Sequence, residues 1–159
     1  TLVTGPTSQQ SGADGEESDA QRAGRYGHTL CTWRRRDAGG ASAVSLVLYG
    51  GVDARGAFLA GAHQYSVADQ CWTELSSAES CASAHPRHAG GVNNAAAAAA
   101  PVPSGRHFHT ASVWQDGMYV FGGKSNGYLN DLWRLDLFTG RWQQLHAGGS
   151  RPSKRWGHV

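Results

Sequence analysis

The chain has 159 residues, enough for one ordinary domain or for part of a larger one. Glycine accounts for 22 residues, roughly twice its usual share, tryptophan for 6, and charged residues for only 16%. This composition argues against a coiled coil and against a helical bundle, and no apolar stretch of about 18 residues or more occurs that would span a membrane. The formal net charge of +2 is too small to indicate a nucleic-acid-binding surface.

The cysteines suggest a reducing environment. Cys31, Cys71 and Cys81 are odd in number and include no Cys-x-x-Cys pair, so we expect free thiols rather than a disulfide framework. An intracellular, cytoplasmic location follows as an expectation. The chain begins with Thr1 rather than Met and shows no signal-peptide pattern, so we interpret it as an excerpt of a longer protein.

Two segments are of low complexity. Residues 1–23 are rich in Ser, Gly, Gln and acidic residues with few apolar side chains, which predicts a disordered tail. Residues 77–104 include six consecutive alanines at 95–100, too few to form a helix alone, followed by Pro-Val-Pro, which would end one. We therefore predict a long inserted loop between two structured parts.

The remaining sequence repeats itself. Short openings that share Arg and His occur three times, as GRYGHT at 24–29, GRHFHT at 105–110 and KRWGH at 154–158. The first two continue in the same order with an apolar run that ends in Gly-Gly, then an aromatic-centred run, then a run around Trp72 or Trp142. We align the aromatic-centred run 63–68 with 132–137. The interval from His109 to His158 is 49 residues, a period typical of repeat architectures.

The second unit predicts four strands, at 109–115, 118–121, 130–137 and 141–145. Asp116-Gly117 is the expected hairpin turn, and Gly122-Gly123 is expected to end the second strand. In the third strand Trp133, Leu135 and Leu137 alternate with Arg134 and Asp136, the period of two that one buried face produces. Four strands joined by short turns predict an antiparallel meander.

These residues resemble the kelch repeat, in two copies and the start of a third. The resemblance implies an all-β fold, a partial β-propeller built from four-stranded antiparallel kelch blades. The implied organisation is a tail at 1–23, blade 1 at 24–76, the inserted loop at 77–104, blade 2 at 105–146 and a truncated start of blade 3 at 147–159. A propeller needs roughly four to eight blades to close. We therefore expect these blades to belong to a longer propeller and to be marginally stable or aggregation-prone alone.

The markers of each unit are predicted to be structural. Glycine pairs suit positive φ or close approach of the neighbouring blade, and the tryptophans suit packing between blades. Arg25, Arg106 and Arg155 recur with His28, His109 and His158, which we interpret as hydrogen-bonded core histidines; Asp131 and Asp136 are alternative acceptors for an Arg fork or for backbone N–H groups. The structural set is Gly50, Gly51, Trp72, Gly122, Gly123, Asp131 and Trp142.

The sequence predicts no metal binding, cofactor binding or catalysis. Cys81, His85 and His88 form a C-x3-H-x2-H pattern that could hold zinc, but no second pair of ligands accompanies it, so we expect no metal site and no cofactor. No nucleophile motif occurs, so we predict no catalytic residues. Repetition of the Arg and His in each unit also argues against catalysis, because a catalytic group is usually needed once.

The resemblance implies that function lies on one rim of the propeller, where the loops after the glycine pairs and the connections between blades emerge. We predict a protein partner that contributes a peptide or loop, with no nucleic acid and no membrane. The alternatives are an accessory propeller domain of a larger multidomain enzyme and, third, a metal-dependent propeller enzyme such as galactose oxidase, whose copper ligands have no match here. The expected partner-binding residues are Arg55, Lys124, Ser125, Asn126, Tyr128, Arg151 and Lys154.

Overall fold

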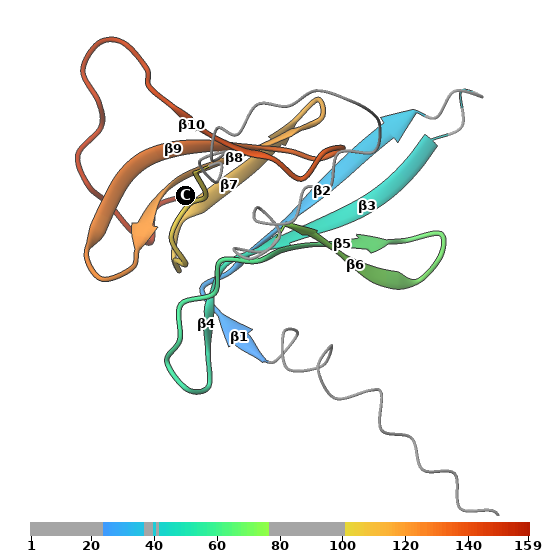
Figure 1. Ribbon diagram of the computed structural model, residues 1–159, viewed down its shortest axis with the longest axis horizontal. Coiled ribbons are helices and arrows are strands. Elements are labelled where there is room, and N and C mark those ends of the chain that lie inside the picture. Colours follow the sequence, from blue (N-terminus) through green and yellow to red (C-terminus); the bar gives the residue numbers. More distant parts are fainter. Residues whose placement is uncertain (1–23, 37–39, 41, 77–100) are drawn as a thin grey trace, which may run out of the picture.

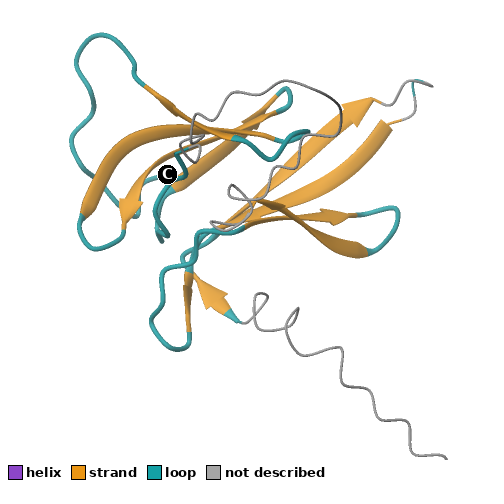
Figure 2. Ribbon diagram, in the orientation of Figure 1, coloured by secondary structure: helices purple, strands orange, loops and turns teal. Residues whose placement is uncertain are grey.

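A computed structural model describes residues 24–36, 40, 42–76 and 101–159 of the chain. Within these residues the structure consists of strands and loops, without helices (Figure 2). The tail at 1–23, most of the inserted loop and the trio Cys81, His85 and His88 lie outside the described residues. The strands are β1 (Arg25–Tyr26), β2 (Thr29–Arg36), β3 (Ser42–Tyr49), β4 (Val52–Asp53), β5 (Ala62–Ser66), β6 (Cys71–Ser76), β7 (Thr110–Trp114), β8 (Gly117–Lys124), β9 (Tyr128–Asp136) and β10 (Trp142–Leu145).

The strands form two separate four-stranded sheets (Figure 1). One has the order β2-β3-β5-β6 and the other β7-β8-β9-β10, and every neighbouring pair is antiparallel. The short strands β1 and β4 pair with each other beside the first sheet. The two sheets are therefore four-stranded antiparallel meanders, which confirms the all-β blades expected from the sequence.

The core lies between the two sheets. Buried side chains of the first blade, such as Val47 and Tyr49, pack with buried side chains of the second, such as Met118 and Leu135. The first strands of the blades, β2 and β7, lie side by side, and the Cys31 thiol of β2 donates to the Ala111 carbonyl of β7 across 3.4 Å. Because each sheet has an apolar face and the described residues include no helix to cover it, burial comes from the neighbouring blade.

Trp142 and Trp72 occupy the same position in their blades but have different surroundings. Trp142 is only 5% exposed, packs at 5.0 Å between ring centroids against Tyr49 of the first blade, and donates from its indole nitrogen to the Ser76 hydroxyl at 2.7 Å. Trp72 is half-buried and packs at 5.2 Å against Tyr65 of its own blade. Trp142 thus joins two blades, whereas the ring contact of Trp72 lies within the first blade.

The structure corrects three details of the sequence prediction. The hairpin between β7 and β8 turns at Gln115-Asp116, not at Asp116-Gly117, since Gly117 already pairs with Trp114 and Gln115 has a φ of +52°. Strand β8 continues through Gly122-Gly123 to Lys124, with an irregularity in its pairing with β9 between Phe121 and Gly123.

The third correction concerns the alignment of the repeats. The pairing of Tyr49 with Ala62 corresponds to that of Phe121 with Leu132, so Ala62 is equivalent to Leu132 and His63 to Trp133. The alignment from the sequence was therefore wrong by one residue in this strand. The position equivalent to Asp131 is Gly61.

No described helix is long and apolar enough to cross a membrane.

We predict that Trp142→Ala lowers the free energy of unfolding by about 3–5 kcal/mol, because it empties a buried aromatic site and leaves the Ser76 hydroxyl without its donor. The matched substitution Trp72→Ala should cost only about 1 kcal/mol, since that ring is half-buried and touches its own blade. Urea unfolding followed by circular dichroism measures both. Equal losses would contradict the assignment of Trp142 to the contact between blades.

Candidate functional site

The two blades and the start of the third unit are joined at one end of the sheets by a repeated backbone contact. The Gly51 N–H donates to the Arg106 carbonyl at 2.8 Å, and the Gly123 N–H donates to the Arg155 carbonyl at 2.9 Å. A Cβ on Gly50, which has a φ of +68°, would lie 2.6 Å from the Arg106 carbonyl oxygen. The glycine pair therefore allows the opening of the next unit to approach the backbone closely.

Histidines complete this joint. The Thr29 hydroxyl and Nε2 of His109 share a hydrogen bond of 2.8 Å, and Thr110 and His158 share the equivalent bond at 3.0 Å. Burial, reinforced by the nearby Arg106 charge, lowers the pKa of His109 to about 3, so its ring is neutral at physiological pH. His28 was predicted to be a core histidine, but its side chain is exposed.

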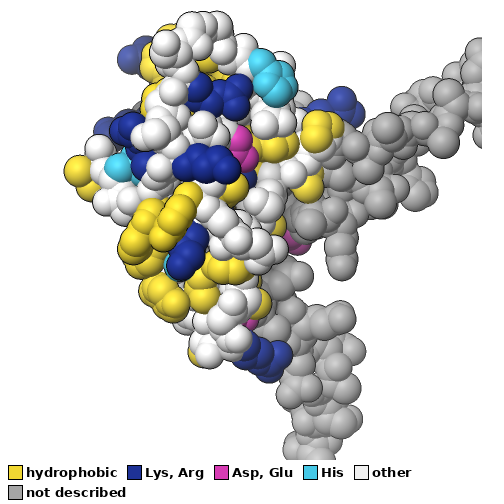
Figure 3. Space-filling view, turned by 90° about the vertical axis from the view of Figure 1, so that its left-hand side faces the viewer, with side chains coloured by type: hydrophobic (Ala, Val, Ile, Leu, Met, Phe, Trp, Pro, Cys, Tyr) yellow, Lys and Arg dark blue, Asp and Glu magenta, His cyan; other side chains and the backbone are white. Residues whose placement is uncertain are grey.

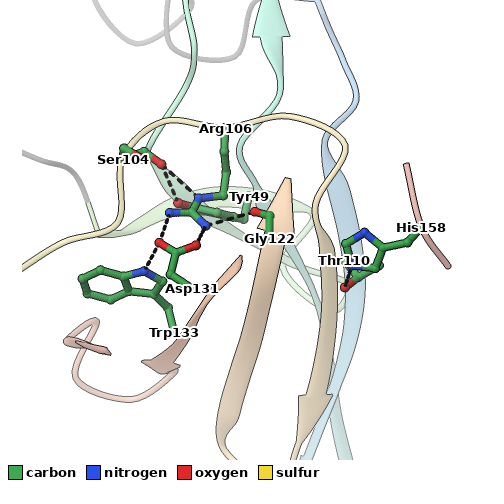
Figure 4. Close-up of polar contacts among 8 residues, drawn as sticks. All are labelled: Tyr49, Ser104, Arg106, Thr110, Gly122, Asp131, Trp133 and His158. Atoms are coloured by element: carbon green, nitrogen blue, oxygen red, sulfur yellow. Dashed lines mark hydrogen bonds and ion pairs between the residues drawn. The ribbon is translucent and has the colours of Figure 1, made fainter. Parts of the chain in front are cut away.

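Arg106 forms a buried ion pair inside the second blade (Figure 4). Its side chain is fully buried, and its guanidinium makes two parallel bonds to the Asp131 carboxylate at 2.7 and 2.9 Å. The guanidinium also donates to the backbone carbonyls of Gly122 and Ser104, both at 3.1 Å. The indole of Trp133 donates to the same carboxylate at 2.7 Å. The fork thereby fixes the opening of the unit to the glycine pair and to β9.

Asp131 and Asp136 take the two roles that the sequence left open. Burial tends to raise the pKa of Asp131, but hydrogen bonds from Arg106 and Trp133 outweigh it and hold that pKa below its usual value. Asp136 instead accepts from the backbone of Phe138 and Thr139 in the turn after β9, and the Thr139 N–H is the main cause of its lowered pKa. The Arg fork therefore goes to Asp131 and the backbone capping to Asp136.

The expected partner-binding residues lie on loops and strand ends at the same end of the sheets as the joints. Ser125 and Asn126 lie in the turn between β8 and β9, with Lys124 as the last residue of β8 and Tyr128 as the first of β9. Arg55 belongs to the loop between β4 and β5, and Arg151 and Lys154 belong to the segment after β10. The ammonium of Lys124 lies 6.0 Å from the centre of the Tyr128 ring. Tyr128, Arg55, Asn126, Arg151 and Lys154 are exposed.

Arg151 lines a hollow of about 200 Å³ together with Phe121, Leu132, Leu145 and Pro152. Phe121 is equivalent to Tyr49, the residue that packs against Trp142 in the first blade. Among the described members of the predicted set, the contact with the Tyr128 ring comes from Lys124.

Sequence reasoning named Tyr128 but missed the aromatic ridge that this residue forms with Tyr26, Phe108 and Trp156. The ring of Phe108 lies 6.2 Å from Tyr26 and 5.5 Å from Trp156, and Trp156 lies 6.2 Å from Tyr128 in a nearly parallel arrangement. Phe108 also borders a hollow of about 210 Å³ lined by His109 and His158. The sequence signal that could have revealed the ridge is an aromatic residue directly after the opening arginine, as in Arg25-Tyr26 and Arg155-Trp156.

The described residues contain no group of three or more His, Cys, Asp or Glu side chains placed to hold a metal ion. Cys31 and Cys71 are free thiols, and burial raises the pKa of Cys31. The polar contacts at the joints are between groups of the chain itself, and they hold backbone and loops in place.

Two four-stranded meanders joined by a repeated contact define a segment of a β-propeller. The chain belongs to the kelch-repeat family: the family model described as the KLHDC2/KLHL20/DRC7 Kelch-repeats domain matches residues 10–159. Repeat proteins of this family are generally protein-interaction modules and generally non-catalytic.

Curated relatives match a part of the chain. It is 45% identical over 59 residues to a tRNA wybutosine-synthesizing protein 2/3/4 of Arabidopsis thaliana, 44% over 61 residues to acyl-CoA-binding domain-containing protein 6 of Oryza sativa subsp. japonica, and 41% over 64 residues to host cell factor 2 of Homo sapiens. Each match covers 36% of this chain and 6%, 9% and 8% of the respective relative. The chain thus spans a small part of the length of these proteins.

We predict that Gly50→Ala lowers the free energy of unfolding by about 2–4 kcal/mol, since the new methyl group meets the Arg106 carbonyl and the backbone keeps a positive φ. Gly56→Ala is the matched control, because Gly56 also has a positive φ, of +81°, but open space around it. That variant should cost about 1 kcal/mol. Urea midpoints compare the two, and equal values would refute close approach as the reason for the glycine.

We predict that stability falls as the pH is lowered from 6.5 toward 3. The folded-state pKa of His109 lies below its unfolded value, so the unfolded chain binds the proton first; the stabilisation is complete above pH 6.5 and declines by about 1.4 kcal/mol per pH unit below it. Urea unfolding at about pH 7, 6 and 5 measures this slope. His109→Gln should reduce the slope, while His146→Gln, at an exposed position, should leave it unchanged.

Proposed function

We propose that this segment is a protein-interaction module that docks a peptide or loop of a partner on the rim formed by the β4–β5 loop, the β8–β9 turn and the segment after β10. The observation that carries the proposal is the way the blades are joined. Backbone groups and buried side chains make the joints, so the side chains of these loops are left exposed for contact. A rigid scaffold with exposed loops bears the ordering cost before a partner binds.

The contact set that we propose combines charge, hydrogen-bonding groups and an aromatic anchor. Tyr128 is 50% exposed and has Lys124 beside its ring, while Asn126 and Lys154 are exposed on the same rim. Tyrosine, tryptophan and arginine are enriched among the residues that dominate binding energy. We further propose that the segment performs no chemistry of its own and works in the cytoplasm.

A second function, an accessory propeller domain of a larger multidomain enzyme, is favoured by one observation. The matching relatives contain the equivalent of this segment in less than a tenth of their length, and one of them is named for tRNA wybutosine synthesis. In that case the rim would position a substrate or an adjoining domain. The same surface would be used, and the partner would be another part of the assembly.

The double variant Tyr128→Ala/Arg151→Ala should lose most captured proteins when the immobilised chain is exposed to a cell extract with crosslinking and mass spectrometry. The loss should be at least about tenfold, corresponding to about 1.4 kcal/mol of binding free energy. The urea midpoint should not change, because both side chains are exposed.

The matched control is Trp114→Ala/Arg34→Ala, which removes an exposed aromatic ring and an exposed cation at the opposite end of the sheets. It should retain the proteins that the unmodified chain captures. If both double variants capture the same proteins in the same amounts, the rim is not the binding surface.

A further inference from the structure

We propose that the aromatic ridge and the cations around it form a docking surface for a protein segment that carries carboxylates beside apolar side chains. This inference rests on the proposed function and gives the partner a chemical class. It follows from three observations, which are the continuity of the ridge, the backbone conformation of Phe108, and the charges at this rim.

The ridge is continuous across three units of the repeat. Tyr26 comes from the opening of the first unit, Phe108 from the second and Trp156 from the third, and Tyr128 extends the row along the β8–β9 turn. The exposed fractions of Tyr26, Trp156 and Tyr128 are 57%, 49% and 50%. Large rings that are half exposed and in contact with one another form an apolar patch of the kind that marks interaction sites.

Phe108 holds a backbone conformation that its side chain disfavours. Its φ is +52°, at the position where the other two openings have Gly27 and Gly157 with φ of +67° and +62°. The conformation is imposed by the joint, since the Phe108 N–H donates to the Gly27 carbonyl and its own carbonyl accepts from Gly157. Glycine would adopt it without strain, whereas a bulky residue pays about 1–3 kcal/mol. Strain of this kind is concentrated at binding sites.

The charges at this rim are unbalanced. The Lys124 ammonium lies 5.9 Å from the centre of the Trp156 ring and 6.0 Å from that of the Tyr128 ring, a cation–π arrangement. Three further cations close to Trp156 in the sequence are exposed, namely Arg151, Lys154 and Arg155. Figure 3, which views the side facing left in Figure 1, shows basic side chains around a hydrophobic patch and little acidic surface.

The described carboxylates at this end are already engaged. Asp131 is held by Arg106 and Trp133, and Asp53 accepts from the backbone N–H groups of Arg55 and Ala57 in its own loop. Within the described residues, the exposed cations of this rim have no ion pair with a carboxylate, and complementarity points to carboxylates on the partner.

The arrangement favours a protein segment over single-stranded nucleic acid. Successive rings are tilted by 55° between Tyr26 and Phe108 and by 50° between Phe108 and Trp156, so they offer no continuous platform on which bases could stack. The parallel pair, Trp156 and Tyr128, has Lys124 beside it. Apolar side chains pack well among tilted rings, and flanking carboxylates reach the surrounding cations.

Phe108→Gly is the most informative variant, since it removes the ring and relaxes the backbone at the same time. A phage-displayed library of random peptides selected on the full 159-residue chain provides the probe. We expect the selected peptides to be enriched in Asp and Glu next to aliphatic or aromatic residues. The strongest peptide, synthesised with a fluorescent label, should lose at least about tenfold in affinity for Phe108→Gly, and its binding should weaken with added salt.

The controls separate binding from folding. Phe108→Gly should unfold at the same urea concentration as the unmodified chain or at a higher one, and Trp114→Ala, which removes an exposed ring from the opposite end, should bind the peptide unchanged. A lower midpoint for Phe108→Gly would assign the ring to packing and overturn the proposal. So would peptides without acidic residues, failure to select any peptide, or tighter binding of polyuridylic acid than of the peptide.

Failure of this inference is distinguishable from failure of the proposed function. If Tyr128→Ala/Arg151→Ala still loses its captured proteins while acidic peptides fail to bind, the rim docks a partner of other chemistry. If that double variant retains its captured proteins, the rim itself is excluded.

Discussion

The structure depends on a hydrogen bond between the second glycine of each pair and the backbone carbonyl of the next unit's arginine. A meander of four strands has two faces, and neither can be buried by its own turns. The bonds from Gly51 to Arg106 and from Gly123 to Arg155 hold neighbouring units at the distance where such faces meet. The glycine at the front of each pair has no side chain that would keep the two backbones apart. Burial of Trp142 and Tyr49 then follows from that spacing.

Unlike this joint, the buried ion pair does not recur in both blades. Arg106 and Asp131 form it in the second blade, whereas the first blade has Gly61 at the position of Asp131. Arg25 nevertheless donates to the Gly50 carbonyl at 3.2 Å, as Arg106 does to Gly122. The arginine's contact with the glycine carbonyl is thus shared, and the carboxylate is an addition. Because desolvation offsets much of the attraction in a buried pair, its role is better described as orienting the arginine than as supplying stability.

Most of the fold was predictable because its signals are local. Strand β9 was found from the alternation of Trp133, Leu135 and Leu137, and the order of the markers identified the blades. The register between strands was not predictable, since the irregular pairing of β8 with β9 beside Gly123 cannot be read from residue types. The turn at Gln115-Asp116 was missed because Asp-Gly is the stronger turn signal in the sequence. In the structure Gln115 takes the positive φ instead.

The ridge was missed for another reason. Its members are separated by up to 130 residues and meet only because the openings of three units lie side by side at the joints.

The direction of the threonine–histidine bonds has a consequence for how such chains vary in length. In each joint the histidine of the later unit reaches back to the threonine of the earlier one, never the reverse, among the described residues. A whole unit could therefore be gained or lost by gene duplication or deletion with every donor still facing an acceptor. Evolution can change the circumference of the ring in steps of one unit, with the angle between neighbouring blades adjusting to the number of units.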